Sequence, residues 1–253
     1  MIELKSEREL ALMRKAGAII GEVFEELRRH IKPRIKTIEL DRISERIIKA
    51  HGARPAFKNY KGYPANICTS INEVIVHGIP GQRSLREGDI ISIDVGVEFK
   101  GYYADSAYTY AVGNVDRGSQ RLIEVTKTSL THGIAQARAG KKVSAISCAI
   151  QQCVESGGFN VIRIFVGHGI GAQLHEPPEI PNFGEPNTGM VLEPGMVVAI
   201  EPMVSAGNFD AEILPDGWTA VTRDRSRVAH FEHTVAITDG EPEVLTLWQR
   251  KSL

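Results

Sequence analysis

The chain has 253 residues, of which 42% are hydrophobic and 24% charged, and its net charge at pH 7 is −1. This length can bury one substantial core or two small ones, and the near-neutral charge gives no reason to expect nucleic acid or an anionic membrane as the main partner. No apolar run approaches the ~20 residues that span a membrane, and the charged start "MIELKSEREL" is not a signal peptide. Three cysteines without a CxxC pair predict reduced thiols in a cytoplasmic protein.

Two helices open the predicted order of elements. Ser6 followed by Glu9 is a capping box, and apolar residues recur behind it at helical spacing to about Arg29. Thr37 is expected to cap a second helix, which Gly52 ends. An irregular aromatic segment, "FKNYKGYPANIC", then leads to a β hairpin, "DIISIDVGVEFKGYYADSAYTYAV", which turns at its central Lys-Gly pair.

One segment between these helices departs from the even charge balance. The run "RRHIKPRIK" supplies five cations, Arg28, Arg29, Lys32, Arg34 and Lys36. It follows a helix end, where the dipole favours cations, so a solvated surface is the main interpretation. The alternative is docking on something acidic, such as ribosomal RNA.

The same order of elements recurs in the second part of the chain. A helix is predicted from about 117 to 138, and a second one holds Ile146, Ile150 and Val154. Strands follow at "FNVIRIFV", "MVVAIEPMV" and "HFEHTVAIT". Because no linker separates the two series of elements, we expect a single domain, 1–253, with an α+β fold. It should consist of two similar halves, about 1–112 and 113–253, that share one antiparallel sheet.

Four acids lie where apolar strand residues are expected. Asp94 in "ISIDVGV", Glu201 in "VVAIEPM" and Glu232 in "HFEHTVAI" interrupt such runs, and Asp105 lies across the hairpin from Asp94. With a two-residue turn, Asp94 and Asp105 become diagonal neighbours on one face of the hairpin. Their Cα atoms are then ~7–8 Å apart, so both carboxylates reach one site.

Each acid alone could pair with a Lys or Arg, or lie at a strand end. Four together are different, because no predicted strand offers a buried cation and close carboxylates repel by about 4 kcal/mol per pair at an effective dielectric near 20. Protonation could relieve this repulsion, but divalent metal would relieve it better, and four negative charges match two ions. With His168, which lies among glycines in "GHGIG", the ligands suit Mn, Fe, Co or Zn.

These residues and the motifs around them, "SIDVG", "YYADSA", "GHGIG", "AIEPM" and "EHTVAIT", resemble type I methionine aminopeptidase, a family with the pseudo-twofold pita-bread fold. The likeness covers essentially the whole chain. The short interval between Glu201 and Glu232 lacks the helical insertion of type II enzymes. With no zinc-finger extension before the catalytic domain, the chain looks like the bacterial type.

The resemblance implies removal of the initiator methionine from nascent proteins when the second residue is small, by attack of a metal-bridging hydroxide. It implies two divalent ions (cobalt, manganese, iron or zinc) held by Asp94, Asp105, His168, Glu201 and Glu232, with Glu201 also shuttling a proton. His77 and His175 are the implied catalytic residues that contact substrate. The implied methionine pocket adds Tyr60, Tyr63, Cys68, Leu174 and Trp218; Leu174 stands where many relatives carry Phe.

Two other functions remain open at this point. A proline-specific aminopeptidase or dipeptidase shares the fold, but usually carries a large N-terminal domain, whereas here about ninety residues precede Asp94. A non-catalytic relative that binds peptides or ribosomes would have lost ligands, and all five are present. The expected partners are N-terminal peptides and, transiently, the ribosome, with no DNA and no membrane, and the chain is expected to be a monomer.

Overall fold

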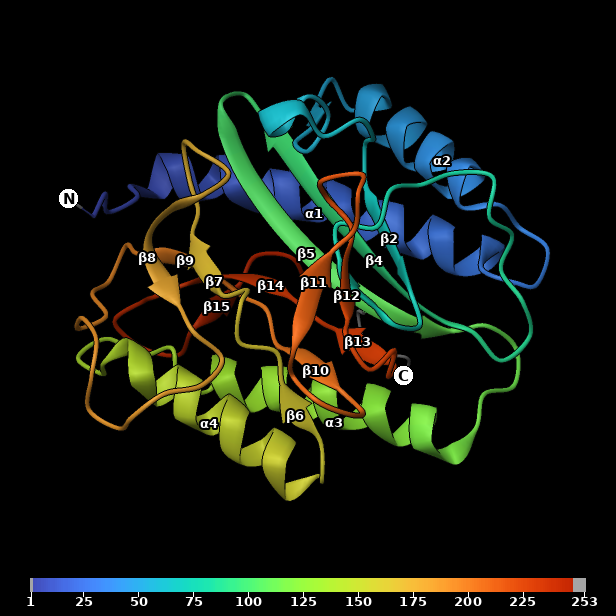
Figure 1. Ribbon diagram of the computed structural model, residues 1–253. Coiled ribbons are helices and arrows are strands. Elements are labelled where there is room, and N and C mark those ends of the chain that lie inside the picture. The colour runs from blue at the N-terminus through green and yellow to red at the C-terminus, as the bar shows by residue number, and fades with distance from the viewer. Residues whose placement is uncertain (1, 248–253) are drawn as a thin grey trace, which may run out of the picture.

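The computed structural model describes residues 2–247. Two helix pairs lie on opposite sides of a set of strands (Figure 1). One pair is α1 (Glu7–His30) and α2 (Thr37–Ala50), and the other is α3 (Arg117–Ile134) and α4 (Val143–Ser156). Every strand pairing between them is antiparallel, as predicted for the α+β pita-bread fold, but the strands form four sheets and not the single shared sheet expected from the sequence.

Helix α1 begins at the predicted capping box. Ser6 is its N-cap, and the Ser6 main-chain N donates to Glu9 Oε2 at 2.7 Å. The apolar face of α1 packs against α2 and against the hairpin of β4 (Ile90–Phe99) and β5 (Tyr102–Ala111). Burial of this face, more than intrinsic propensity, stabilises the helix.

The start of α2 differs from the prediction. Thr37 is the first helical residue, and Lys36 is the N-cap. The Thr37 hydroxyl accepts from Gly81 N at 2.8 Å and donates to Gly81 O at 3.2 Å. The hydroxyl is therefore used to attach the helix to a loop distant in sequence, and it does not cap the helix.

Helix α3 also ends earlier than predicted, at Ile134 and not near Arg138. After Ile134, the main-chain N–H groups of Gln136 and Ala137 bond carbonyls three residues earlier, at Gly133 and Ile134. Such i→i−3 bonds are typical of tight turns, so the apolar spacing continues while the helix does not.

The hairpin has the predicted register. Asp94 on β4 faces Ala107 on β5, and Asp105 faces Gly96. Two further strands pair with β4, namely β1 (Arg54–Pro55) and β2 (Cys68–Ile71). The 3-10 helix η1 (Tyr60–Gly62) lies in the aromatic segment between them. The remaining strands form three more sheets: β13 (Val228–His230), β10 (Met203–Ser205) and β6 (Asn160–Val161); β11 (Ala211–Ile213), β12 (Ala220–Thr222) and β3 (Val74–Val76); and β15 (Glu243–Val244), β14 (His233–Ala236), β9 (Val197–Ile200), β7 (Gly167–Gly169) and β8 (Glu176–Ile180).

Three runs predicted as single strands are shorter or interrupted. The run 196–204 divides between β9 and β10 at Glu201-Pro202, where proline has no N–H for the ladder. The run 230–238 divides between β13 and β14 at residues 231–232, and the run 159–166 is a strand only in β6. The first two interruptions place Glu201 and Glu232 outside regular pairing, at the wall of a central cavity.

Two large hydrophobic clusters form the core. One packs α1 and α2 onto β4 and β5, around Phe24, and the other packs α3 and α4 onto the second set of strands, around Phe231. Within residues 2–247, none of the helices has the length and apolar character needed to cross a membrane. The division of the domain into similar halves, 1–112 and 113–253, stays a prediction.

Candidate functional site

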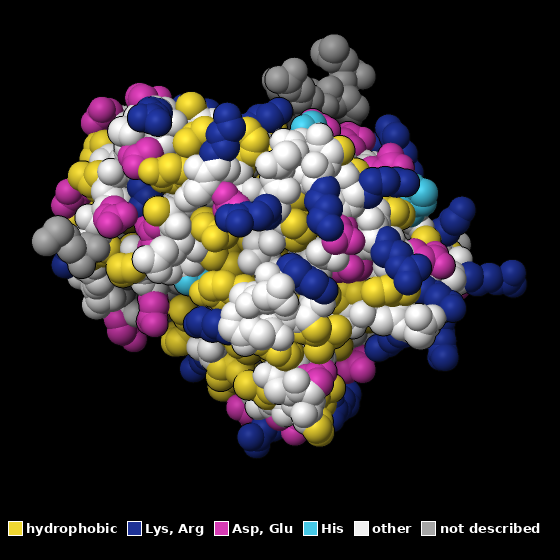
Figure 2. Space-filling model, turned by 90° about the horizontal axis from the view of Figure 1, so that it is seen from above, with side chains coloured by type: hydrophobic (Ala, Val, Ile, Leu, Met, Phe, Trp, Pro, Cys, Tyr) yellow, Lys and Arg dark blue, Asp and Glu magenta, His cyan; other side chains and the backbone are white. Residues whose placement is uncertain are grey.

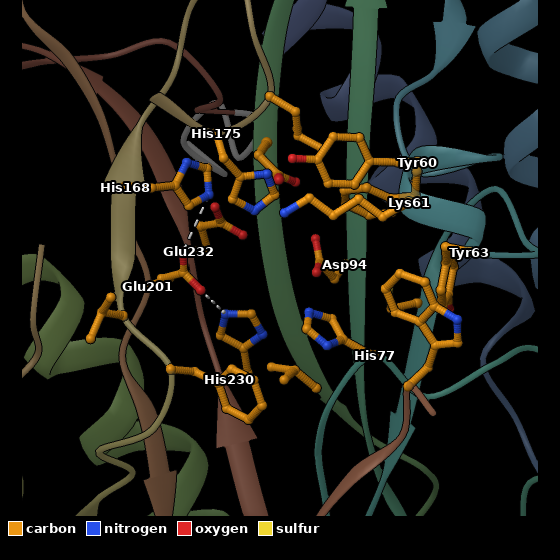
Figure 3. A pocket seen from close by; sticks show the side chains of 18 of the residues that line it. Tyr60, Lys61, Tyr63, His77, Asp94, His168, His175, Glu201, His230 and Glu232 are labelled. Atoms are coloured by element: carbon orange, nitrogen blue, oxygen red, sulfur yellow. Dashed lines mark ion pairs between the residues drawn. The ribbon is translucent and has the colours of Figure 1, made fainter. Parts of the chain in front are cut away.

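A cavity of about 330 Å³ lies among the strands between the two helix pairs (Figure 3). Its wall includes all five predicted metal ligands, Asp94, Asp105, His168, Glu201 and Glu232. It also includes the predicted substrate residues, Tyr60, Tyr63, Cys68, His77, Leu174, His175 and Trp218. The structure thus brings every predicted site residue to one cavity.

Hydrogen bonds between β5 and the residue just before β14 place Asp105 and Glu232 side by side. Glu232 N donates to Ala107 O at 2.9 Å, and Ser106 Oγ donates to Glu232 O at 2.6 Å. Asp94 reaches the same place from β4, as the diagonal neighbour of Asp105 on one face of the hairpin. The carboxylates therefore converge because of strand register.

His168 completes a cluster with the geometry of a metal site. Asp105, His168 and Glu232 each offer one ligand atom, and these atoms lie within 4.8 Å of one another. His168 Nδ1 donates to Gly169 O at 2.9 Å, which leaves Nε2 as the ligand atom. That Nε2 lies 3.5 Å from Glu201 Oε1.

Protein groups compensate the four acids Asp94, Asp105, Glu201 and Glu232 only in part; Ser106 N donates to Asp105 Oδ1 at 3.0 Å. Within the described residues, no Lys or Arg forms an ion pair with any of these acids, and the ion pairs of Glu201 are with His168 and His230. Asp94 Oδ1 and Glu232 Oε1 are buried without a hydrogen-bond partner. Burial raises the pKa of Asp94 to about 7, and burial together with neighbouring carboxylates raises the pKa values of Asp105, Glu201 and Glu232. Orphaned carboxylate oxygens beside one imidazole fit a divalent transition metal.

The two other predicted histidines lie on different sides of the cluster. His175 lies beside His168, with ring centroids 4.1 Å apart, and its opposite face stacks on Tyr60 at 5.2 Å. His77 meets Trp218 edge-to-face at 6.2 Å, and burial lowers its pKa. Both imidazoles are neutral near pH 7 and able to donate one hydrogen bond each.

The predicted methionine pocket is apolar. Tyr63, Cys68 and Leu174 are buried in one hydrophobic cluster. The Tyr63 hydroxyl donates to Gly78 O at 3.1 Å, so its polar atom is satisfied away from the cavity, and its ring meets Trp218 at 5.1 Å. Burial raises the pKa of the Cys68 thiol, which keeps it neutral. A slot of aromatic rings and sulfur suits a flexible thioether side chain.

Some cavity residues were not predicted from the sequence. His230 is 2% exposed, and its Nε2 lies 3.9 Å from Glu201 Oε2. Lys61 and Ile164 are exposed residues of the wall, and Figure 3 shows Lys61 extending toward His175. His230 could have been found, because it stands two residues before Glu232 and extended backbone places such residues on one face.

A buried carboxylate and imidazole cluster opening into an apolar, peptide-sized cavity defines a metal-dependent hydrolase. The sequence gives the particular family: residues 11–239 match metallopeptidase family M24, and the chain belongs to it.

Comparisons with individual proteins agree. The chain is 54% identical to methionine aminopeptidase 1 of Bacillus subtilis, over 97% of this chain and 99% of that protein. The crystal structure of methionine aminopeptidase from Rickettsia prowazekii is similar with a TM-score of 0.96 and 42% identity, covering 98% of this chain and 100% of that one. The crystal structure of methionine aminopeptidase from Thermotoga maritima is similar with a TM-score of 0.96 and 46% identity, covering 97% of this chain and 99% of that one. The family and fold predicted from the motifs are confirmed.

Proposed function

We propose that the chain is a methionyl aminopeptidase, which hydrolyses the bond after an N-terminal methionine. The observation that carries this proposal is the cluster of carboxylates in the cavity wall that lies beside His168 and has, within the described residues, no Lys or Arg ion-pair partner. Full-length similarity to methionine aminopeptidases supports the choice of substrate over the proline-specific alternative. The physiological substrates are nascent proteins with a small second residue.

The ligand set is proposed to hold two divalent ions. Asp94, Asp105, His168, Glu201 and Glu232 would hold these ions. A bound divalent ion lowers the pKa of water and polarises the substrate carbonyl. Cobalt, manganese, iron and zinc all suit these ligands, so availability decides between them. Mass spectrometry of metals in protein purified without added metal would identify the ions.

Protein groups position the peptide and move its protons. Glu201 is proposed to take the proton of the attacking water and give it to the leaving amine. His175 donates a hydrogen bond to the carbonyl oxygen as negative charge develops there. His77 contacts the substrate beside the scissile bond. Tyr60, Tyr63, Cys68, Leu174 and Trp218 enclose the methionine side chain.

Hydrolysis of a Met-Ala-Ser peptide tests the proposal. Asp94→Asn, Asp105→Asn and Glu201→Gln should each abolish turnover, and His168→Ala should lose metal and activity together. His77→Ala and His175→Ala should keep their metal while kcat/KM falls, by ~10²–10³-fold for His175 as an oxyanion donor. Full activity after exhaustive chelation, or hydrolysis of an Ala-Pro peptide in preference to Met-Ala-Ser, would contradict the proposal.

The second residue of the substrate is proposed to be limited to small side chains. A Met-Ile peptide should resist cleavage because the β-branched side chain has few rotamers with which to enter a narrow site. Leu174→Phe should change kcat/KM for Met-Ala peptides by no more than about tenfold, since one sulfur–aromatic contact is worth ~0.3–1.5 kcal/mol. Equal rates for Met-Ala and Met-Ile peptides would exclude this specificity while leaving the metal chemistry in place.

Transient ribosome contact is proposed for the basic cluster formed by Arg28, Arg29, Lys32, Arg34 and Lys36. Figure 2 shows Lys and Arg side chains projecting from the side of the molecule at which α1 ends. Glu25 and Glu26 pair with two of the arginines, which weakens the cluster and suits transient binding. Co-sedimentation with ribosomes should fall with salt and with Lys32→Glu/Arg34→Glu. Salt-independent binding would exclude this contact.

We also infer a cytoplasmic monomer. The free thiols Cys68, Cys148 and Cys153 support a reducing compartment. Light scattering of the purified protein tests the monomer, and a stable dimer at micromolar concentration would exclude it.

A further inference from the structure

The imidazole of His175 is placed by its main chain and by ring contacts. Among the hydrogen bonds of residues 2–247, none involves this ring, which stacks on Tyr60 and meets the His168 ring at a tilt. His175 is moreover an exposed residue of the cavity wall. A side chain held in this way keeps its position only if the loop that carries it is fixed.

Glu176, the next residue, closes that loop with both carboxylate oxygens. Glu176 Oε1 accepts from Gln173 N at 2.9 Å, so the carboxylate spans the turn in which His175 lies. Glu176 Oε2 accepts from Lys5 Nζ at 2.5 Å. One oxygen therefore shapes the loop, and the other attaches it to the N-terminal segment.

Lys5 is itself held from several sides. Its side chain is only 5% exposed, its Nζ also donates to Glu3 O at 2.9 Å, and its main-chain N donates to Gly195 O at 2.7 Å. Its stem packs against Gly171, where a Cβ would lie 2.1 Å from Lys5 Cε. The glycine at 171 thus lets the loop close onto the lysine, and the loop is also tied to β5 by Tyr103 N, which donates to Gly171 O at 2.8 Å.

A buried ion pair is a poor device for stability alone, because desolvation of both charges offsets their attraction and apolar replacements are often equally stable. The hydrogen bonds of such a pair are directional, however, so they fix the relative position of its two side chains. We propose that Lys5 is a positioning residue for catalysis: through Glu176 it fixes the loop that presents His175 to the substrate carbonyl. This inference rests on the proposed role of His175 and makes the N-terminal segment part of the active-site scaffold.

The first test is Lys5→Met in the metal-loaded enzyme with a Met-Ala-Ser peptide. The expected result is a fall in kcat of at least about tenfold with metal content unchanged, since a 1 Å misplacement can reduce rates ~10²-fold. Lys5→Arg should recover most of the kcat. Lys49→Met, which breaks the exposed pair of Lys49 with Glu45 on α2, is the matched control and should leave kcat unchanged.

A double-mutant cycle asks whether Lys5 acts through His175. In the His175→Ala background, Lys5→Met should reduce kcat no further. If the two residues acted independently, their separate fold-reductions in kcat would multiply. Lys5→Met/Glu176→Gln removes both charges, so its Tm should return toward wild type while kcat stays low. Return of kcat together with Tm would show a merely structural pair and overturn the inference.

The outcomes separate this inference from the proposed function. If His175→Ala loses kcat and Lys5→Met keeps it, only the positioning role of Lys5 is overturned. If His175→Ala keeps full kcat, the proposed role of His175 fails, and the positioning role fails with it. Loss of metal from Lys5→Met would also overturn the inference, because the loop would then support the metal ligands and not His175.

Discussion

Thr234 on β14 holds the main chain of Asp105 on β5 with two hydrogen bonds. Its Oγ1 accepts from Asp105 N at 2.9 Å and donates to Asp105 O at 2.8 Å, and the threonine is fully buried. Glu232 stands two residues before Thr234. The threonine therefore sets the spacing between two acids that are far apart in the chain, and it does so without touching the metal ligand atoms.

Thr234→Val preserves shape but removes both hydrogen bonds, so Asp105 should be less well placed as a ligand. We expect metal affinity to fall ~10–100-fold, as is typical when outer partners of ligands are lost. Activity measured against free Mn²⁺ should shift to higher concentration and recover at saturation. Thr126→Val is the control, since this buried hydroxyl bonds Leu122 O within α3. An unchanged Mn²⁺ dependence would contradict the assignment.

The hairpin shows how much of the site the sequence could predict. A two-residue turn fixes the register of both strands, so the shared face of Asp94 and Asp105 followed from local sequence alone. Glu201 and Glu232 could be recognised because acids are unusual in apolar runs. Their approach to the hairpin, by contrast, depends on tertiary packing between β5 and β14, which the resemblance supplied and periodicity did not.

Other features could not be read from the sequence. The run 159–166 has the composition of a strand, but only β6 is regular, and Ile164, 56% exposed, belongs to the cavity wall. Apolar composition does not distinguish a core strand from the wall of an apolar site. Similarly, Lys5 and Glu176 look like two ordinary surface charges, because their burial arises only when segments distant in the chain meet.

Metal-free protein should be stabilised by removing one of the clustered charges. Asp105 is 4% exposed and has acidic neighbours, so Asp105→Asn relieves both desolvation and repulsion. We expect the Tm of Asp105→Asn in EDTA to exceed that of wild type by about 2–4 °C for each kcal/mol gained in the free energy of unfolding. With saturating Mn²⁺, wild type should have the higher Tm, because it binds the metal more tightly. Calorimetry with and without metal measures this.

Asp41→Asn is the contrasting control for that experiment. Asp41 is also buried, but its carboxylate accepts from Asn66 N at 2.8 Å and from Ile67 N at 3.2 Å. Its replacement should lower the Tm whether or not metal is present. If both variants lowered the Tm in EDTA, the cluster would not be electrostatically strained in the absence of metal.

Acid should weaken the start of α1 through Glu9. Hydrogen bonds from Tyr102 and Ser6 lower the Glu9 pKa to about 2. Because this folded-state pKa lies below the unfolded value, the carboxylate's stabilisation is fully present above pH ~4.5 and is lost as the pH falls toward 2. Glu9→Gln should lower the Tm at pH 7, where a cap contributes ~1 kcal/mol. The difference from wild type should shrink at pH 3, and a constant difference would exclude this role of the charge.

His230 should affect catalysis without holding metal. Burial lowers its pKa to about 3, so at pH 7 it is a neutral donor whose Nε2 points toward Glu201 Oε2, 3.9 Å away, and has no hydrogen-bond partner. This distance can shorten when substrate fills the cavity. His230→Ala should therefore lower kcat about tenfold or more with metal content unchanged, because Glu201 loses the donor that would come within hydrogen-bond distance of it in the substrate complex. His230→Gln should recover part of the kcat, since its amide also donates, and His132→Ala, at the exposed end of α3, should have no effect. Loss of metal in His230→Ala would make His230 a ligand, contrary to the assignment made from the geometry.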